Sequence, residues 1–409
     1  MRVIADDLTG ACDVGAALHG IGVPVVVESI DAATAGTGAA LVVRNTQSRT
    51  LAPDVAAARV RRALADAPRT RDGVVLKKID TALRGPLGAE IDATMGAVGA
   101  ALAIVLPAIP DVGRTTVGGR QLHEGIPVHE TAFARDPQNP VAESRVAAVI
   151  AATSSRRVAE ISLDDVHAGR LAGAVARRRA EGASVVVGDA ETDADLARWV
   201  DGLFESRLGD AALPLVLVGS TGLAKACRQL PPGWLPRAAG VAPRAAIGPA
   251  GAGVLVVSGS AHPVTRAQLV DAEGSVGLES TTVDVGSPDA SGDAVAARVA
   301  AGGVAALVAP PGSVAGGSER VLDAVASAAA AVLARVRPRA LVLVGGETAF
   351  AVLAKLGHPR LVIDRPAPMP LVACATIAEG TAAGTAVITK GGSTGEAGRL
   401  SALVAEAMR

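Results

Sequence analysis

The sequence has 409 residues but little aromatic character, with three Phe, two Trp and no Tyr. A row of stacking rings therefore cannot be the main means of binding single-stranded nucleic acid or the faces of sugars. Cysteine is also scarce, and Cys12, Cys227 and Cys374 lie far apart with no CxxC spacing. This argues against disulfides and against a cysteine-rich zinc site, and it indicates a reducing, cytoplasmic location.

Neither sign of charge dominates, because the chain contains 39 Lys and Arg residues and 40 Asp and Glu residues, for a net charge of −1. That balance argues against a nucleic-acid partner held by a general basic field, although a local patch could still hold a small anion. Long apolar runs are missing too. The stretch 95–110 is broken by Gly and Pro, and the N-terminus meets Asp6 after five residues. Neither a membrane span nor a signal peptide is predicted.

Short apolar runs alternate along the chain with longer Ala-, Leu- and Arg-rich segments of helical spacing. Fully apolar runs of this length are typical of parallel strands covered on both faces, so the sequence predicts an α/β fold of mostly parallel sheets flanked by helices. The expected strands cover 23–27, 40–43, 74–76, 102–106, 184–187, 215–218, 254–257, 305–308, 341–344 and 386–388. The expected helices cover 53–66, 87–98, 165–181, 193–203, 264–271, 319–335, 348–355 and 396–408.

The length predicts two domains, because a domain typically holds about 100–200 residues. Residues 231–253 contain five Pro and five Gly with little periodicity, which is typical of a linker between domains. We place the boundary near residue 243, so that the domains cover 1–243 and 244–409.

Glycine-rich turns follow four of the expected strands, and three of them come after residue 250. Gly lets a ligand approach the backbone closely, and the exposed N–H groups at a helix start attract anions. Together these three turns predict a polyphosphate site in the C-terminal domain, formed by Ser258, Ser260, Gly345, Gly346, Glu347, Thr348, Lys390, Gly391 and Gly392. The GxxxxGK[ST] pattern is absent and no GxGxxG follows the first strand, which argues against a usual P-loop or a Rossmann dinucleotide site.

Acidic and basic residues gather at expected strand ends in the N-terminal domain. Asp6 and Asp7 come directly after the first strand, and Lys77 and Lys78 end another. Arg84 precedes Pro86 at a predicted helix start, where a guanidinium and the helix dipole together would hold a carboxylate or phosphate. Two more arginines, Arg49 and Arg114, are expected in loops after strands. This rim fits a small, acidic, hydroxylated metabolite.

A zinc site is not predicted from the His-Glu pairs at 123–124 and 129–130. The histidines stand six apart across Gly125 and Pro127, whereas one helical face requires a spacing of four. The metal ligands of this chain are therefore left unassigned.

In this order, the motifs resemble those of the four-carbon acid sugar kinases. The resemblance spans nearly the whole chain, and its most specific part combines an opening Asp-Asp-x-Thr-Gly-Ala with a late Gly-Gly-Glu-Thr and a closing Lys-x-Gly. The matching segments are 5–11, 45–49 followed by Pro53, 77–85, 107–115, 130–131 through 136–137 to Pro140, 219–223, 258–260 with 265–266, 345–348 and 390–392.

The resemblance implies a sugar-acid-binding N-terminal domain and a nucleotide-binding C-terminal domain. It implies ATP, with Mg²⁺ carried by the nucleotide, as the donor for the terminal hydroxyl of threonate, erythronate or 3-oxo-tetronate. Carried over by motif, the substrate side holds Asp6, Asp7, Lys78, Asp80 and Arg84, and the nucleotide side holds Ser258, residues 345–348 and Gly392.

Our reading is that an Asp takes the proton of the acceptor hydroxyl, and the candidates are Asp7, Asp6 and Asp80. Neighbouring side chains on an extended segment point opposite ways, so we expect only one of Asp6 and Asp7 to face the acceptor. Arg84 is expected to hold the anionic end of the acceptor. A nicotinamide-dependent sugar-acid dehydrogenase and a non-enzymatic metabolite-binding protein stay as alternatives, and a homo-oligomer stays open.

Overall fold

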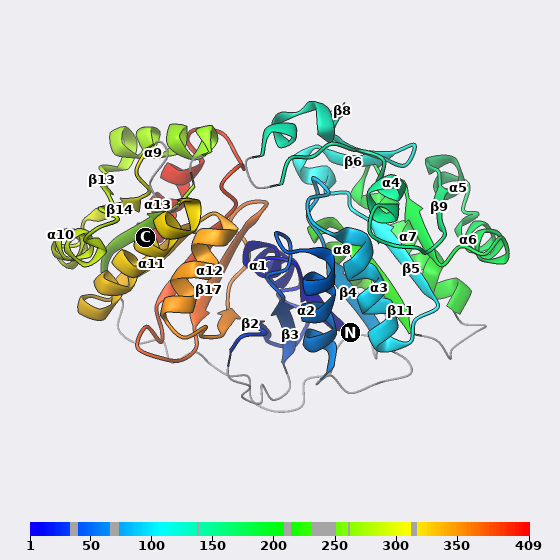
Figure 1. Cartoon of the computed structure of the whole chain (residues 1–409), viewed down its shortest axis with the longest axis horizontal. Coiled ribbons are helices and arrows are strands. Elements are labelled where there is room, and N and C mark those ends of the chain that lie inside the picture. The colour runs from blue at the N-terminus through cyan, green and yellow to red at the C-terminus, as the bar shows by residue number, and fades with distance from the viewer. Residues whose placement is uncertain are drawn as a thin grey trace. The chain divides into compact units, whose positions relative to one another are not determined.

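The computed structural model describes residues 1–32, 40–65, 73–136, 139–207, 214–230, 251–260, 262–311 and 317–409. The chain divides into two compact units (Figure 1). The first unit joins Met1–Val23 to Ala39–Ala239, and the second joins Pro24–Gly38 to Gly240–Arg409. The predicted boundary at residue 243 and most of the predicted linker lie outside the described residues, while Ala252 and Gly253 already belong to a strand.

The sheet of the first unit is parallel throughout. Its strand order is β3 (Leu41–Asn45), β1 (Arg2–Ala5), β4 (Val74–Lys78), β11 (Leu215–Gly219), β5 (Leu102–Leu106), β10 (Val185–Gly188) and β9 (Val158–Ile161). Every residue of β4 and β11 is buried, as expected for central strands that are covered on both faces.

Two rows of helices cover this sheet. In one row α1 (Leu8–Ala17) contacts α8 (Thr221–Ala226), which contacts α7 (Asp193–Arg207). In the other, α2 (Pro53–Ala65) packs on α3 (Leu87–Val98), which contacts α4 (Val146–Ala151). The expected helix over 165–181 is in fact two helices, α5 (Leu163–His167) and α6 (Leu171–Ala180). Gly169 stands between them with φ +66°, a left-handed conformation that ends a helix.

A second, antiparallel sheet in this unit contains β6 (Arg114–Val117), β7 (Arg120–His123) and β8 (Ile126–Pro127). The buried Asp189 holds its β6–β7 turn, because its carboxylate accepts the N–H groups of Gly118 and Gly119 at 2.8 and 2.9 Å. Three short 3-10 helices lie near it in the chain: η1 (Pro110–Val112), η2 (Val128–Glu130) and η3 (Ala132–Arg135).

The sheet of the second unit is parallel over five strands and antiparallel over the next three. Its order is β13 (Glu279–Thr282), β14 (Val304–Val308), β12 (Ala252–Ser258), β15 (Pro338–Val344), β18 (Ala386–Lys390), β17 (Val372–Ile377), β16 (Leu361–Ile363) and β2 (Val25–Ser29). Strand β2 comes from the N-terminal part of the chain, which nothing in its sequence indicates.

Helices flank this sheet as well (Figure 1). The neighbours α10 (Pro288–Ala300), α11 (Gly317–Arg335) and α12 (Gly346–Lys355) pack in a row, and α9 (Pro263–Val276) packs on α13 (Arg399–Met408). Alternate residues of β12 and β15, such as Val254, Val256 and Val342, form a core with Leu400 and Leu403 of α13. The predicted α/β fold of mostly parallel strands flanked by helices is thus confirmed in both units.

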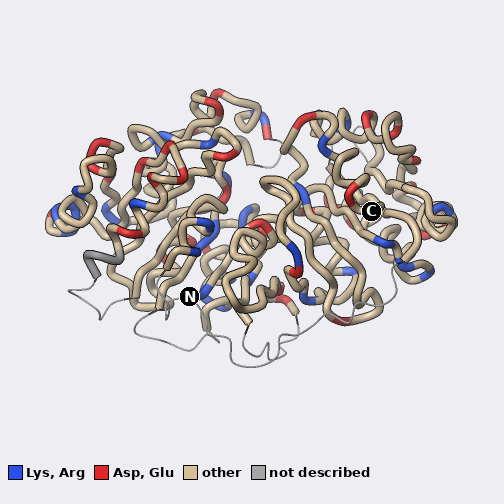
Figure 2. Tube along the Cα trace, turned by 180° about the vertical axis from the view of Figure 1, so that it is seen from behind, with Lys and Arg blue, Asp and Glu red and all other residues tan. Residues whose placement is uncertain are grey.

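Acidic and basic residues are interspersed along the trace of each unit (Figure 2), in keeping with the balanced composition. All three cysteines are buried and lie outside any disulfide, as predicted. Among the described residues, no helix is both long and apolar enough to cross a membrane.

Candidate active site

Three neighbouring strands of the first unit, β3, β1 and β4, end at the same edge of the sheet. The carboxyl ends of parallel strands are where ligands bind in open α/β sheets. Asp6 and Asp7 follow β1, Arg49 follows β3, and Asp80 follows β4. The topology therefore brings together four residues that the sequence places in the substrate site.

The Arg49 guanidinium is the centre of this group. Its Nε and Nη2 donate to the two carboxylate oxygens of Asp6, each at 2.9 Å, and Nη2 also donates to Oδ1 of Asp7 at 2.6 Å. Its Nη1 lies 3.9 Å from Oδ1 of Asp80. The expectation that Asp6 and Asp7 point opposite ways is therefore wrong. Strand β1 ends at Ala5 and the chain bends at Asp6 and Asp7 before α1 begins at Leu8, so both carboxylates reach the same guanidinium although the backbone of Asp7 is itself extended.

Burial and ion pairing act in opposite directions on these carboxylates. Burial disfavours the ionised form of Asp6, but Arg49, Lys77 and Lys78 outweigh it and lower the pKa of Asp6 to about 2. Burial also disfavours the ionised form of Asp80, yet Arg84 and then Arg49 hold its pKa well below the usual range. The carboxylates of Asp6 and Asp80 are therefore both ionised, and both are weak bases.

Arg84 spans two carboxylates. Its Nε and Nη2 donate to Asp80 at 2.7 and 3.0 Å, and its Nη1 donates to Asp136 at 2.7 Å. Helix α3 begins at Leu87 after its N-cap Pro86, so Arg84 does precede a helix start, as predicted. Gly85 has φ +97°, and a Cβ there would lie 3.0 Å from the carbonyl oxygen of Arg49. Glycine at this position thus lets the two arginine loops pack together.

Arg114 begins β6 rather than occupying a loop, which corrects the sequence-based expectation. Its Nη1 donates to the Thr81 hydroxyl, and its Cζ lies 5.1 Å from the centroid of the Phe133 ring. The Cζ of Arg84 lies 5.7 Å from the same centroid. Arg114 therefore joins the substrate-side group from a separate sheet, and Phe133 links the two arginines.

Lys78 lies beside Asp7 at the start of α1. A Cβ on Gly10 would lie 2.4 Å from Oδ1 of Asp7 and 2.9 Å from Nζ of Lys78, which locates both groups against this glycine. The ammonium donates to the carbonyl oxygen of Ile79 at 2.7 Å. Asp7 in turn accepts the N–H of Gly10 at 3.0 Å and the hydroxyl of Thr9 at 2.7 Å.

A buried ion pair between Lys77 and Glu90 supports the loop that holds Arg49. The sequence analysis did not predict this pair. Nζ of Lys77 lies 3.1 Å from Oε2 of Glu90, and both side chains are almost fully buried. The hydroxyl of Ser48 donates to Oε1 of Glu90, while the backbone N–H groups of Ser48 and Arg49 donate to the carbonyl oxygen of Asp6. The available signal was that a lysine in a fully buried strand requires a counter-charge.

In the second unit, the strands β12, β15 and β18 are neighbours that run parallel, so the three glycine-rich turns after them lie at one edge. The Thr348 hydroxyl accepts the N–H of Gly259 at 3.0 Å. The Thr265 hydroxyl donates to the carbonyl oxygen of Gly392 at 2.6 Å, and Gly345 N–H donates to that of Lys390 at 2.8 Å. The structure thus joins the predicted nucleotide-side turns.

Lys390 ends β18 and is fully buried. Its Nζ donates to the carbonyl oxygen of Gly391 at 2.7 Å. Burial, with a smaller contribution from Arg399, lowers the pKa of this lysine to about 7. The Lys390 side chain therefore gains or loses its positive charge near neutral pH.

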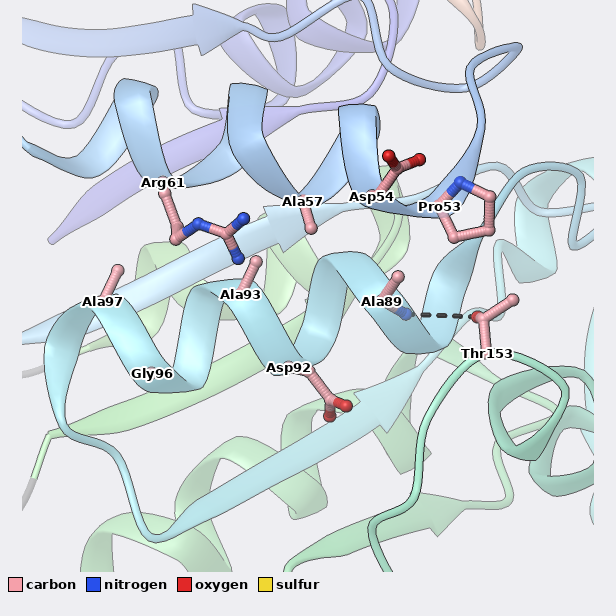
Figure 3. A pocket seen from close by; sticks show the side chains of 10 residues that line it. All are labelled: Pro53, Asp54, Ala57, Arg61, Ala89, Asp92, Ala93, Gly96, Ala97 and Thr153. Atoms are coloured by element: carbon pink, nitrogen blue, oxygen red, sulfur yellow. Dashed lines mark hydrogen bonds between the residues drawn. The ribbon is translucent and has the colours of Figure 1, made fainter.

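A hollow of about 380 Å³ lies between α2 and α3 (Figure 3) and contains none of these residues. Small side chains line much of it, such as Ala57, Ala93 and Gly96. Asp92 at its rim pairs with Arg156 at 2.8 Å. We assign it no part in the site. Within the described residues, no group of three His, Cys, Asp or Glu side chains could hold a metal ion.

Two family models match the chain. A sugar-binding N-terminal domain matches residues 1–227, and a nucleotide-binding C-terminal domain matches residues 255–400. A crystal structure from Salmonella typhimurium LT2, described as a tRNA synthase, has a TM-score of 0.77 over 99% of this chain and 98% of that one. At 22% identity this likeness concerns the fold alone.

Three curated relatives are sugar-acid kinases. A D-threonate kinase of Salmonella typhimurium is 37% identical over 66% of this chain, and a D-erythronate kinase of Heliobacterium modesticaldum is 36% identical over 69%. These matches span only 60% and 62% of the relatives' own lengths. A D-threonate kinase of Bordetella bronchiseptica is 34% identical over 96% of this chain and 94% of its own length. The chain therefore belongs to the family of four-carbon acid sugar kinases.

Proposed function

We propose that this chain is an ATP-dependent kinase that phosphorylates the terminal hydroxyl of a four-carbon sugar acid such as threonate, erythronate or 3-oxo-tetronate. The observation that carries the proposal is the arginine-bridged carboxylate group at the ends of β1, β3 and β4, in the part of the chain that matches the sugar-binding family. The kinase names of the relatives favour this reaction over a dehydrogenase and over a binding protein without activity.

The nucleotide side is the edge formed by the three glycine-rich turns of the second unit. A Cβ on Gly392 would lie 2.8 Å from the Ser260 hydroxyl oxygen, so glycine here lets the turn after β18 pack directly against the turn after β12. We assign ATP binding to the hydroxyls and N–H groups of these turns: Ser258, Ser260, Gly345, Gly346, Glu347, Thr348, Gly391 and Gly392, with Lys390. ATP, when bound, would supply the phosphoryl group, and the Mg²⁺ that it carries would neutralise phosphate charge.

Asp7 is the best of the three candidates for the general base. Asp6 is held at both oxygens by Arg49 and Asp80 at both oxygens by Arg84, and each has a lowered pKa. Arg49 holds only Oδ1 of Asp7, whereas Oδ2 accepts the Thr9 hydroxyl. We therefore assign Oδ2 of Asp7 as the atom that takes the proton of the acceptor hydroxyl.

The test is an ADP-release screen of the full chain over four-carbon sugar acids, each with and without ATP and Mg²⁺. We expect ADP release that depends on one of these acids, and a phosphorylated acid whose ester lies at the terminal oxygen. ADP release that no sugar acid stimulates would contradict the proposal. Reduction of a nicotinamide cofactor in the presence of a sugar acid would favour the alternative function, a dehydrogenase.

Replacing Gly392 by Ala should weaken ATP binding about tenfold. The new Cβ would displace Ser260, and overpacking of this kind costs about 1–3 kcal/mol. The measurement is the ATP Kd by calorimetry. Gly274→Ala in α9 is the matched control, since a Cβ there meets nothing within 4 Å. Unchanged ATP affinity in Gly392→Ala would remove this turn from the nucleotide site.

ATP affinity should fall as the pH rises through 7. Lys390 has a pKa of about 7, and a nearby phosphate favours its charged form, so ATP binding takes up a proton. Above pH 7 the affinity should drop by up to about tenfold per pH unit. Calorimetry in buffers of different ionisation enthalpy measures this uptake. Lys390→Met should abolish it, whereas the half-exposed Lys355→Met should not. Equal uptake in both variants would exclude Lys390.

The domain boundary at residue 243 stays a prediction, and so do the cytoplasmic location and a homo-oligomer.

A further inference from the structure

The three arginines of the substrate-side group, Arg49, Arg84 and Arg114, are not equally neutralised. Arg49 faces Asp6 and Asp7, and Arg84 lies between Asp80 and Asp136. Each of these two arginines is thus matched by two carboxylates. Arg114, in contrast, forms no ion pair with any residue in the described parts of the chain.

Arg114 is also deeply buried, with only 8% of its surface exposed. One end of its guanidinium is used, because Nη1 donates to the Thr81 hydroxyl. Within the described residues, Nε has no hydrogen-bond partner. Burial accordingly lowers the pKa of Arg114, and the more distant Asp80 and Asp13 only partly oppose this. A buried charge without a counter-ion is costly, so the site favours the arrival of an anion.

The position of Arg114 is fixed by its surroundings. Phe133 packs against the guanidinium, a contact that favours a cation. On the same face of the small sheet, the buried Thr116 hydroxyl donates to Gln121 at 2.7 Å. The turn of this sheet is held by Asp189. The arginine is therefore pre-organised, which reduces the entropy lost when it binds a ligand.

We propose that Arg114 binds the carboxylate of the acid substrate, while Arg49 and Arg84 serve to hold the carboxylates of the protein. This inference rests on the proposed function and refines it, because it orients the acid in the site. The carboxylate lies at Arg114, and the chain of carbinols extends toward Asp80 and Asp7. The hydroxyl that reaches Asp7 is then the one farthest from the carboxylate, which accounts for a terminal phosphorylation.

The experiment compares Arg114→Gln with Arg120→Gln in the full chain. Arg120 is the matched control, since it lies on the neighbouring strand β7 with its side chain 48% exposed. D-threonate and D-erythronate are the acids, and the corresponding neutral tetritols, which carry a hydroxymethyl group in place of the carboxylate, serve as competitive inhibitors. Calorimetry gives the Kd of each compound, and ADP release gives KM and kcat.

For Arg114→Gln we expect the Kd and KM of the acid to rise about 10- to 150-fold, the range for hydrogen bonds to charged groups. The inhibition constant of the tetritol and the ATP affinity should stay within about threefold, since neither compound uses this contact. Arg120→Gln should match the wild type throughout. Arg114→Lys keeps the charge but loses the planar fork, and it should give an intermediate loss even if the Gln variant folds poorly.

Each result decides between distinct readings. If acid and tetritol weaken equally in Arg114→Gln and in Arg114→Lys, Arg114 is only structural and the inference is overturned. The inference is also overturned if the acid binds normally to Arg114→Gln while Arg84→Gln loses it selectively, because Arg84 then holds the carboxylate. A wild-type chain that binds the acid without phosphorylating it contradicts the proposed reaction alone, and one that binds none of the acids contradicts both.

Discussion

Replacing Asp7 by Asn should lower kcat for sugar-acid phosphorylation about 10²- to 10⁴-fold, the usual range for loss of a general base. Asn has nearly the same shape, but its amide nitrogen takes no proton from the acceptor hydroxyl. The ATP affinity should hardly change, because the nucleotide side is formed by other turns. Steady-state kinetics with the acid identified by the ADP-release screen would measure the effect.

The fold should tolerate this substitution. Asp7 is the N-cap of α1 and accepts the N–H of Gly10, and Asn is about as favourable as Asp at an N-cap. Its side-chain oxygen can still accept from Arg49. The melting temperature should therefore stay close to that of the wild type, which separates loss of the base from loss of structure.

Asp195→Asn is the matched control for this experiment. Asp195 is a fully buried aspartate of the same unit that accepts the N–H groups of Glu191 and Thr192 at the start of α7. It lies outside the substrate-side group, so its replacement should leave kcat unchanged. Near-normal turnover in Asp7→Asn would remove Asp7 as the base and direct attention to Asp6 and Asp80.

Much of the fold can be predicted where apolar runs and helical spacing are unambiguous. The helix over 87–98 and the strand over 102–106 have the bounds that the sequence predicts. The candidate substrate residues could also be predicted as a group, because β1, β3 and β4 are parallel neighbours and their following loops share an edge. Strand order fixes this proximity once each strand end is identified.

The pairing within the site could not be predicted. Arg49 and Asp6 stand 43 residues apart, and Arg84 and Asp136 stand 52 apart, so no local pattern signals which carboxylate meets which guanidinium. Phe133 is one of only three Phe in the chain, yet its role follows from two arginines that meet its ring in space. For the same reason the sequence analysis favours Arg84 as the residue that binds the anionic end of the acceptor. The sequence does not show that the Arg84 guanidinium already donates to Asp80 and Asp136.

Strand β2 shows a similar limit for the fold. An apolar strand is expected over 23–27 and β2 covers Val25–Ser29, two residues later, but nothing in the sequence shows that β2 pairs with β16, more than 300 residues later in the chain. The hydrophobic periodicity of a strand indicates which of its faces is buried, but it does not indicate which strand pairs with it. The single helix predicted over 165–181 is wrong because Gly169, which adopts the left-handed conformation, separates α5 from α6.

The buried pair of Lys77 and Glu90 should have the largest effect on stability. Glu90→Gln keeps the shape and still accepts from the Ser48 hydroxyl, but it removes the carboxylate that is paired directly with the buried ammonium of Lys77. Breaking such a pair costs about 3–5 kcal/mol. Chemical unfolding of the full chain would measure this loss. Glu181→Gln, which breaks the surface pair with Arg178, is the control and should cost at most about 1 kcal/mol.

The double variant Lys77→Met/Glu90→Leu separates the charge from the packing. With both charges removed, no uncompensated ion remains, so the unfolding free energy should exceed that of Glu90→Gln and can reach or pass that of the wild type. Activity should behave differently. Without Glu90 the Ser48 hydroxyl loses its acceptor and the Arg49 loop loses its support, so the KM of the acid should rise even where stability is regained. A double variant as unstable as the single one would show that packing, not charge compensation, makes Glu90 necessary.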